Sequence, residues 1–199
     1  FDLHAFRYDG GTPIDLGTLG GSSSGAAAIN NPGQVVGASL TAGNLQSHAF
    51  YFDGTMHDLG TLGGLYSTAL DIDDSGRIVG PAYDSNGDGH AFLYAAGVMN
   101  DLGTLGGTTS VATAINAGGL IAGYAQTPGD AGTHPFLYDN GTLLDLGTLG
   151  GELDYAVAIN AAGQVVGMSY LSGAAFPVGL LWDGGALRDL NTLIDPASG

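Results

Sequence analysis

A short acidic segment at residues 84–89 has the residue types and the spacing of a calcium-binding loop. It reads Asp84-Ser85-Asn86-Gly87-Asp88-Gly89. Carboxylate and amide oxygens that alternate along a glycine-turned loop can wrap one hard cation. The twelfth position is Ala95, where a complete loop carries a bidentate glutamate. We predict a Ca²⁺ site at Asp84, Asn86 and Asp88, and the alternative is a solvated turn.

Five tyrosines near the variable segments of the chain suggest a second kind of chemistry. They are Tyr66, Tyr83, Tyr124, Tyr155 and Tyr170. A tyrosine ring has a flat apolar body and a polar tip, which suits it to stacking on sugar rings or on a polymer surface. We expect all five to lie on one face of the fold and to contact a ligand there. The alternative is that these rings only cover the core.

The residues available for catalysis are few. Glu152 is the only glutamate, and Asp154 follows it closely. Glycoside hydrolysis needs two carboxyl groups about 5 to 10 Å apart in a cleft, and Glu152 with Asp154 or Asp88 is the pair that we consider. The chain has no cysteine, which excludes a thiolate nucleophile or metal ligand and a disulfide framework. A glycoside hydrolase or lyase is therefore an alternative to a non-catalytic protein.

Charge and composition exclude several partners. The chain of 199 residues carries 3 basic and 19 acidic side chains, for a net charge of −16. Without a cationic surface it is not expected to bind nucleic acid or an anionic membrane. No apolar run approaches the roughly 20 residues that span a bilayer. The hydrophobic content of 44% with only 11% charged residues predicts a folded chain.

Three markers repeat in register along the chain with a period of 43 or 44 residues. Asp-Leu-Gly-Thr-Leu-Gly-Gly stands at 15–21, 58–64, 101–107 and 145–151, with a degenerate copy at 189–195. His-Ala-Phe or His-Pro-Phe stands at 4–6, 48–50, 90–92 and 134–136, with a degenerate copy at 178–180. Ile-Asn or Ile-Asp stands at 29–30, 72–73, 115–116 and 159–160, and each copy precedes a glycine. The period identifies a repeat architecture.

One period predicts four short strands and no helix. In the first complete period we expect strands at 26–30, 34–39 and 48–52, and then a turn at Asp53-Gly54 that returns the chain through Asp58. Four antiparallel strands per period of this length are typical of a β-propeller blade. The predicted fold is therefore an all-β β-propeller, and the alternative is a solenoid.

The strand count predicts an incomplete last unit. Five copies of the third and fourth strands accompany only four copies of the first and second, which makes about four and a half repeats. We predict a single repeat domain over 1–199 with five blades, one of them lacking half of its strands. Unpaired strand edges of that half-blade could recruit another chain, so self-association is a further expectation.

The repeated histidines and aspartates are interpreted as structural. His4, His48, His90 and His134 fall on third strands, too far apart around a ring to meet at the roughly 2 Å distances of a zinc site. We expect them to pack between blades or to bond the neighbouring turn. The aspartates that begin the glycine-rich marker are expected to cap N–H groups of the loop that follows. They are Asp15, Asp58, Asp101, Asp145 and Asp189.

The pattern His-Ala-Phe, Asp-Leu-Gly-Thr-Leu-Gly-Gly and Ile-Asn-x-x-Gly-x-Val-Val-Gly resembles the HAF family of bacterial extracellular repeat proteins over essentially the whole chain. The resemblance implies secretion, a propeller-like repeat fold and no established enzymatic activity, and it assigns no functional residues. Members of that family continue into a further Ile-Asn hairpin, so we expect the chain to be an excerpt of a longer secreted protein.

These observations favour a secreted, non-catalytic module that binds a glycan or another extracellular ligand. The loops between second and third strands vary most and are expected to carry the specificity. They run over 40–47, 83–89, 126–133 and 170–177. A hydrolase or lyase and a self-assembling structural repeat protein remain the two alternatives.

Overall fold

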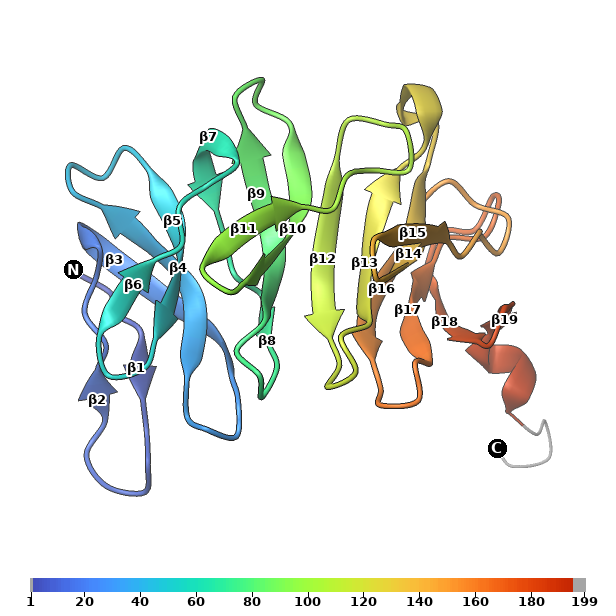
Figure 1. The fold of residues 1–199 in the computed structure, drawn as a ribbon. Coiled ribbons are helices and arrows are strands. Elements are labelled where there is room, and N and C mark those ends of the chain that lie inside the picture. The colour runs from blue at the N-terminus through green and yellow to red at the C-terminus, as the bar shows by residue number, and fades with distance from the viewer. Residues whose placement is uncertain (1, 195–199) are drawn as a thin grey trace. The chain divides into compact units, whose positions relative to one another are not determined.

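The computed structural model describes residues 2–194, and nearly all of its regular structure is β-strand (Figure 1). The exceptions in this range are two single 3-10 turns, at Pro128–Asp130 and Leu190–Leu193. Over the same residues, no helix has the length and apolar character needed to cross a bilayer. The chain divides into two compact units, Phe1–Asp101 and Leu102–Gly199, which we describe separately.

The first unit contains a strand pair followed by two meanders of antiparallel strands. The pair consists of β1 (Phe6–Arg7) and β2 (Ile14–Asp15). The first meander, repeat 1, consists of β3 (Gly20–Ile29), β4 (Val35–Thr41), β5 (Ser47–Phe52) and β6 (Met56–Asp58). Repeat 2 consists of β7 (Gly63–Ser67), β8 (Asp71–Ile72), β9 (Ile78–Asp84), β10 (Gly89–Ala95) and β11 (Val98–Asp101). A short parallel pairing of β5 with β7, at Ser47 and Tyr66, joins the two meanders into one sheet.

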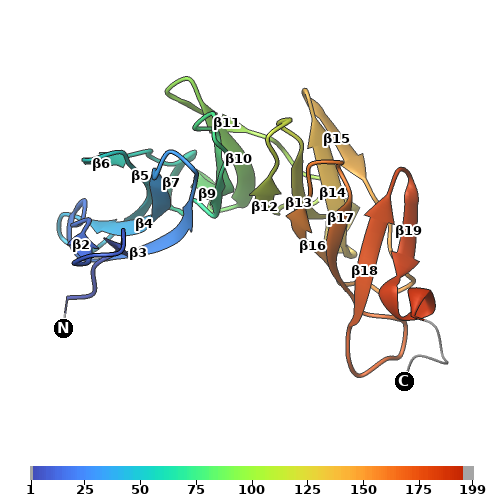
Figure 2. The same cartoon turned by 90° about the horizontal axis from the view of Figure 1, so that it is seen from below.

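The second unit contains two further sheets of the same plan. Repeat 3 consists of β12 (Ser110–Ile115), β13 (Ile121–Gln126), β14 (Thr133–Asp139) and β15 (Thr142–Asp145). Repeat 4 consists of β16 (Asp154–Ile159), β17 (Val165–Ser169), β18 (Val178–Asp183) and β19 (Ala186–Asp189). Figure 2 shows the strands of repeat 4 side by side in their sequence order. None of the sheets that the described residues form closes on itself.

The predicted strands of the first complete period are present, with one difference at the beginning of the first strand. β3 starts at Gly20, whereas the predicted strand begins at residue 26, so β3 also includes the double glycine of the marker. A Cβ atom on Gly21 would lie 2.6 Å from the Cβ atom of Leu40. The absence of a side chain lets this part of the chain run closely along the end of β4.

The core of each repeat is built on one large residue of the third strand. Phe50 is fully buried and lies opposite Gly37 of β4 on one side and Asp58 of β6 on the other. A Cβ atom on Gly37 would lie 2.0 Å from the carbonyl oxygen of Gly25, so only glycine permits this approach of β4 to β3. The same arrangement recurs at Phe92 with Gly80, at Phe136 with Gly123 and at Leu180 with Gly167.

The repeated histidine and aspartate form a pair in which the aspartate also caps the following loop. The Nδ1 atom of His48 lies 2.9 Å from the carboxylate of Asp58, and this carboxylate accepts the N–H of Gly60 at 2.8 Å. The pairs His4 with Asp15 and His134 with Asp145 have the same geometry. The structural interpretation of these markers is therefore confirmed.

Candidate ligand-binding site

A cleft in repeat 2 brings together four of the predicted site residues, Tyr66, Tyr83, Asp84 and Asn86. It lies between the beginning of β7 and the loop after β9, and its volume is about 470 Å³. This size is within the range of small-molecule sites. The residues that line it are Gly63, Gly64, Leu65, Tyr66, Tyr83, Asp84, Ser85, Asn86 and Gly87.

Two tyrosines that line this cleft, Tyr66 on β7 and Tyr83 on β9, are in contact with each other. Ser67 pairs with Ala82 in the antiparallel β7–β9 ladder, and Tyr66 and Tyr83 are the chain neighbours of this pair, at the point where the register shifts. Their ring centroids are 5.8 Å apart and their planes meet at 80°, an edge-to-face contact. Tyr66 is 47% and Tyr83 is 41% exposed, so both rings present apolar surface to the cleft.

Sequence reasoning missed two glycines that line the cleft, Gly63 and Gly64. A Cβ atom on Gly64 would lie 2.5 Å from the carbonyl oxygen of Asp84, so any side chain at this position would clash with the chain of the neighbouring strand. The signal in the sequence was the double glycine that ends the repeated marker, which stands here at Gly63 and Gly64.

The predicted calcium loop lies at the rim of this cleft, and its groups are bonded to one another. The Asp84 carboxylate accepts the N–H groups of Asn86 at 2.8 Å and of Asp88 at 3.0 Å. The Asn86 side-chain amide donates to the same carboxylate at 2.9 Å. The N–H of Asp88 makes the largest contribution to lowering the pKa of Asp84. Over the described residues, no group of three or more histidine or acidic side chains is placed to hold a metal.

Repeat 4 has a cleft at the equivalent place, with a different lining. Its volume is about 330 Å³, and it contains Tyr170 at the position that Tyr83 occupies in repeat 2. Leu153 stands where repeat 2 has Tyr66, so the tyrosine pair is not repeated. Glu152 lines this cleft and is exposed, whereas Asp154 is fully buried and does not line it.

Tyr124 and Tyr155 form a separate contact in the second unit. Their rings come from β13 of repeat 3 and β16 of repeat 4, with centroids 4.9 Å apart at an interplanar angle of 89°. Both are half-buried, and burial, with a smaller contribution from Tyr155, raises the pKa of Tyr124. When the repeats are aligned, Tyr124 lies two residues before the position of Tyr83, and Tyr155 lies two residues after the position of Tyr66. The five predicted tyrosines therefore form two pairs and one single residue.

Comparisons with known proteins support the architecture alone. No protein-family model matches the chain, and no curated protein sequence matches it. A solved structure described as "putative TolB from Agrobacterium tumefaciens" superposes with a TM-score of 0.66 over 90% of this chain and 69% of that chain, at 14% sequence identity. At this identity the likeness concerns the fold, so the chain has a β-propeller-like all-β fold.

Proposed function

We propose that the protein is a non-catalytic binding module that recognises a glycan through the cleft of repeat 2. The edge-to-face contact of Tyr66 with Tyr83 is the observation that carries this proposal. Two partly exposed rings that hold each other in place present a preformed apolar wall, so little side-chain freedom is lost when a ligand binds. A sugar ring has apolar C–H faces that pack on such a wall.

The polar side of the cleft supports a hydroxyl-rich ligand. Asp84, Ser85 and Asn86 border the same space as the tyrosines and offer carboxylate, hydroxyl and amide groups. Hydroxyl groups of a sugar can donate to and accept from these groups while the ring stacks on tyrosine. The Ca²⁺ site at Asp84, Asn86 and Asp88 is part of the same proposal. A bound cation would replace the bonds that Asp84 makes within its own loop.

The finer architecture and the location belong to this proposal as well. We take the four-stranded repeats as blades of a five-bladed β-propeller, in which β1 and β2 are the outer half of a blade. The regular repetition of the strands and the likeness to the Agrobacterium structure support this view. The resemblance to the HAF family supports a secreted, extracellular protein.

A glycan array followed by titration calorimetry tests the binding proposal. We expect Tyr66→Ala with Tyr83→Ala to weaken binding by on the order of tenfold, which corresponds to about 1.4 kcal/mol. Tyr8→Ala is the matched control, because Tyr8 is 60% exposed and lies outside this cleft. The proposal is wrong if no glycan is retained, or if the double variant binds as tightly as the control.

A glycoside hydrolase or lyase is the second candidate, and the position of Glu152 in the cleft of repeat 4 is the feature that favours it. Its test uses the glycans that the array retains. Release of new sugar ends by the wild type, abolished in Glu152→Gln, would support the enzyme. Unchanged glycans after prolonged incubation would support the binding module.

A further inference from the structure

In repeats 1 and 3, the loop after the second strand supplies a side-chain oxygen to the chain that follows the double glycine of the marker. The Oδ1 atom of Asn44 accepts the N–H of Ser22 at 2.8 Å. The Oδ1 atom of Asp130 accepts the N–H of Thr108 at 2.8 Å. Ser22 and Thr108 each come directly after the double glycine of their repeat. Both repeats therefore contain an internal acceptor for the same backbone N–H group.

These two acceptors occupy the same position of a tight turn. The N–H of Asn44 donates to the carbonyl oxygen of Thr41 at 3.0 Å, and the N–H of Asp130 donates to that of Thr127 at 2.9 Å. The φ angle is 58° at Asn44 and 55° at Asp130. Asparagine and aspartate adopt this left-handed conformation more readily than other residues with a side chain. The turn therefore directs a side-chain oxygen at the N–H group.

Repeat 2 has a glycine at this position of the turn. The N–H of Gly87 donates to the carbonyl oxygen of Asp84 at 3.2 Å, so Gly87 is the equivalent of Asn44 and Asp130. Leu65 follows the double glycine of repeat 2, and no side chain in the described part of the chain accepts its N–H. Gly87 and Leu65 both line the cleft of about 470 Å³. The place of the loop oxygen in repeats 1 and 3 is therefore part of the cleft in repeat 2.

Repeat 4 differs from repeats 1 and 3 in the same way. The N–H of Ala174 donates to the carbonyl oxygen of Leu171 at 3.0 Å, which makes Ala174 the equivalent of Gly87. The methyl group of alanine cannot accept a hydrogen bond. Glu152 follows the double glycine of repeat 4 and lines the cleft of about 330 Å³. Each of the two clefts thus lies in a repeat whose turn residue has no side-chain oxygen.

We propose that the cleft of repeat 2 binds the acetamido group of an N-acetylated sugar, whose carbonyl oxygen accepts the N–H of Leu65. This inference rests on the proposed glycan binding and names the class of sugar. The side chain of Asn44 is the internal equivalent of the ligand, because its carboxamide oxygen accepts the corresponding N–H in repeat 1. The acetamido methyl group packs on Tyr66 and Tyr83, which line the same cleft.

A neutral amide fits this cleft better than the carboxylate of an acidic sugar. The Asp84 carboxylate lines the cleft, and hydrogen bonds, above all from the N–H of Asp88, lower the pKa of Asp84, so it is ionised at neutral pH. It would repel a second carboxylate, and the net charge of −16 opposes an anionic ligand as well. An acetamido group instead has an N–H that the Asp84 carboxylate can accept.

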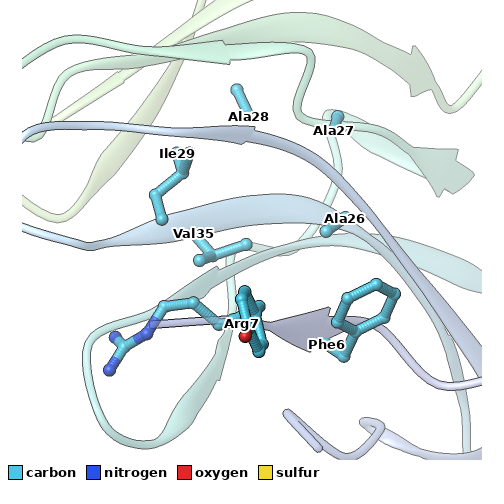
Figure 3. A pocket seen from close by; sticks show the side chains of 8 residues that line it. Phe6, Arg7, Ala26, Ala27, Ala28, Ile29 and Val35 are labelled. Atoms are coloured by element: carbon cyan, nitrogen blue, oxygen red, sulfur yellow. The ribbon is translucent and has the colours of Figure 1, made fainter. Parts of the chain in front are cut away.

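A second groove of the first unit lacks this arrangement. It lies between residues 6–8 and β3, and its volume is about 260 Å³. Figure 3 shows Phe6 and Arg7 on the β1 segment, with the side chains of Ile29 and Val35 across from them. Neither a glycine of the marker nor a loop after a second strand is among the described residues that line this groove. We therefore assign no sugar to it.

Pairs of sugars that differ in one substituent test the acetamido group. N-acetylglucosamine and N-acetylgalactosamine, free and as short chains, are compared by titration calorimetry with glucose and galactose, which have a hydroxyl group at the same carbon. We expect an N-acetylated sugar to bind at least about tenfold more tightly than its hydroxyl counterpart. If both members of every pair bind equally, or if only glycans without an acetamido group bind, this inference is wrong and glycan binding stands. If no glycan binds, both proposals are wrong.

Two variants of Gly87 test where the group binds. Gly87 has a φ of 92° and no atom within 4 Å of an added Cβ atom, so Gly87→Asn and Gly87→Ala carry the same kind of backbone strain without a clash. Asparagine can accept the N–H of Leu65 as Asn44 accepts that of Ser22, whereas alanine cannot. We expect the N-acetylated sugar to bind Gly87→Asn at least about tenfold more weakly than Gly87→Ala. Equal affinities of the two variants would overturn the proposal.

Amide hydrogen exchange measured by NMR follows the N–H of Leu65 directly. Its exchange should slow at least about tenfold when the N-acetylated sugar is added to the wild type, and it should already be slow in Gly87→Asn without sugar. The N–H of Ser22 is the control, because Asn44 accepts it in both states. Unchanged exchange at Leu65 in the presence of bound sugar would overturn the proposal. Protection by a short asparagine-containing peptide, but not by the sugar, would identify a peptide ligand and would also overturn it.

Discussion

Pro135 and Asp154 stand at positions whose equivalents in the first unit, Ala49 and Ser67, are joined by a hydrogen bond. There, the N–H of Ala49 donates to the Ser67 hydroxyl. Proline has no N–H to donate, and Asp154 stands where the other repeats have serine. Asp154 is fully buried, and neither of its carboxyl oxygens has a hydrogen-bond partner. The two changes together leave a carboxyl group in the core without the bond that its serine equivalent receives.

Asp154→Ser is expected to stabilise the protein. A buried polar group without a partner costs about 1–3 kcal/mol, and serine at this position can donate to the Gly147 carbonyl as Ser67 donates to that of Gly60. We expect the free energy of unfolding in urea to rise by about 1–3 kcal/mol. Asp139→Ser, at an exposed position, should change it by less than about 0.5 kcal/mol. An Asp154→Ser variant that unfolds at lower urea concentration than the wild type would contradict this account.

The stability of the protein should depend on pH through Asp154. Burial raises the pKa of Asp154 above its ordinary value of 3.8, against smaller opposite effects of the Ser169 hydroxyl and of His134. Between 3.8 and the raised pKa the folded state binds more protons than the unfolded state. The stabilising contribution of the protonated Asp154 to the free energy of unfolding is therefore fully present below pH 3.8 and is lost as the pH rises through the raised pKa of Asp154.

Asp154→Asn isolates this effect, because other aspartates act in the opposite direction. Hydrogen bonds lower the pKa of Asp15 and of Asp74, so their stabilising contributions are lost as the pH falls below 3.8. We expect the stability of Asp154→Asn relative to the wild type to increase with pH across the window above 3.8 and to be constant outside it. Urea unfolding at a series of pH values measures this difference. Parallel curves for the two proteins would show that Asp154 has an ordinary pKa.

Glycine in the second strand is expected to be essential for folding. Gly37→Ala places a Cβ atom 2.0 Å from the carbonyl oxygen of Gly25, where only backbone displacement can relieve the clash. We expect a loss of on the order of 3 kcal/mol in unfolding free energy. Gly25→Ala is the control, since no atom lies within 4 Å of the added Cβ atom and the loss should be below about 0.5 kcal/mol. Equal losses in the two variants would contradict the packing described for Phe50.

Calcium is expected to raise the melting temperature if the loop at residues 84–89 binds it. A ligand at a hundred times its Kd adds about 2.7 kcal/mol of stability. Scanning calorimetry in millimolar Ca²⁺ and in chelator measures the shift, and Asp88→Asn should reduce it. Asp183→Asn, outside this loop, should leave it unchanged. Equal melting temperatures in Ca²⁺ and chelator would leave the loop as a turn held by Asp84.

The strands, turns and caps of this protein were predictable from its sequence because they depend on short segments. The strand ranges around residues 34–52 and the capping of the marker loops by Asp15 and Asp58 follow from turn chemistry within a few residues. The clefts were less predictable. Tyr83 and Asp84 were expected at a ligand face, but the close approach of Gly64 to their backbone depends on how β7 packs against β9.

What the sequence determined by itself was the repeated unit: its period, its four strands, and the glycine, histidine and aspartate positions that each copy needs. The tertiary structure alone decided which side chains meet. The pairing of β7 with β9 brought Tyr66 into contact with Tyr83, and packing buried Asp154 but left Phe6 exposed. The physical reason is that turn and strand preferences act over a few residues, whereas the burial of a side chain depends on which strand lies beside it. Copies of the same sequence marker have different neighbouring strands, so their side chains differ in burial.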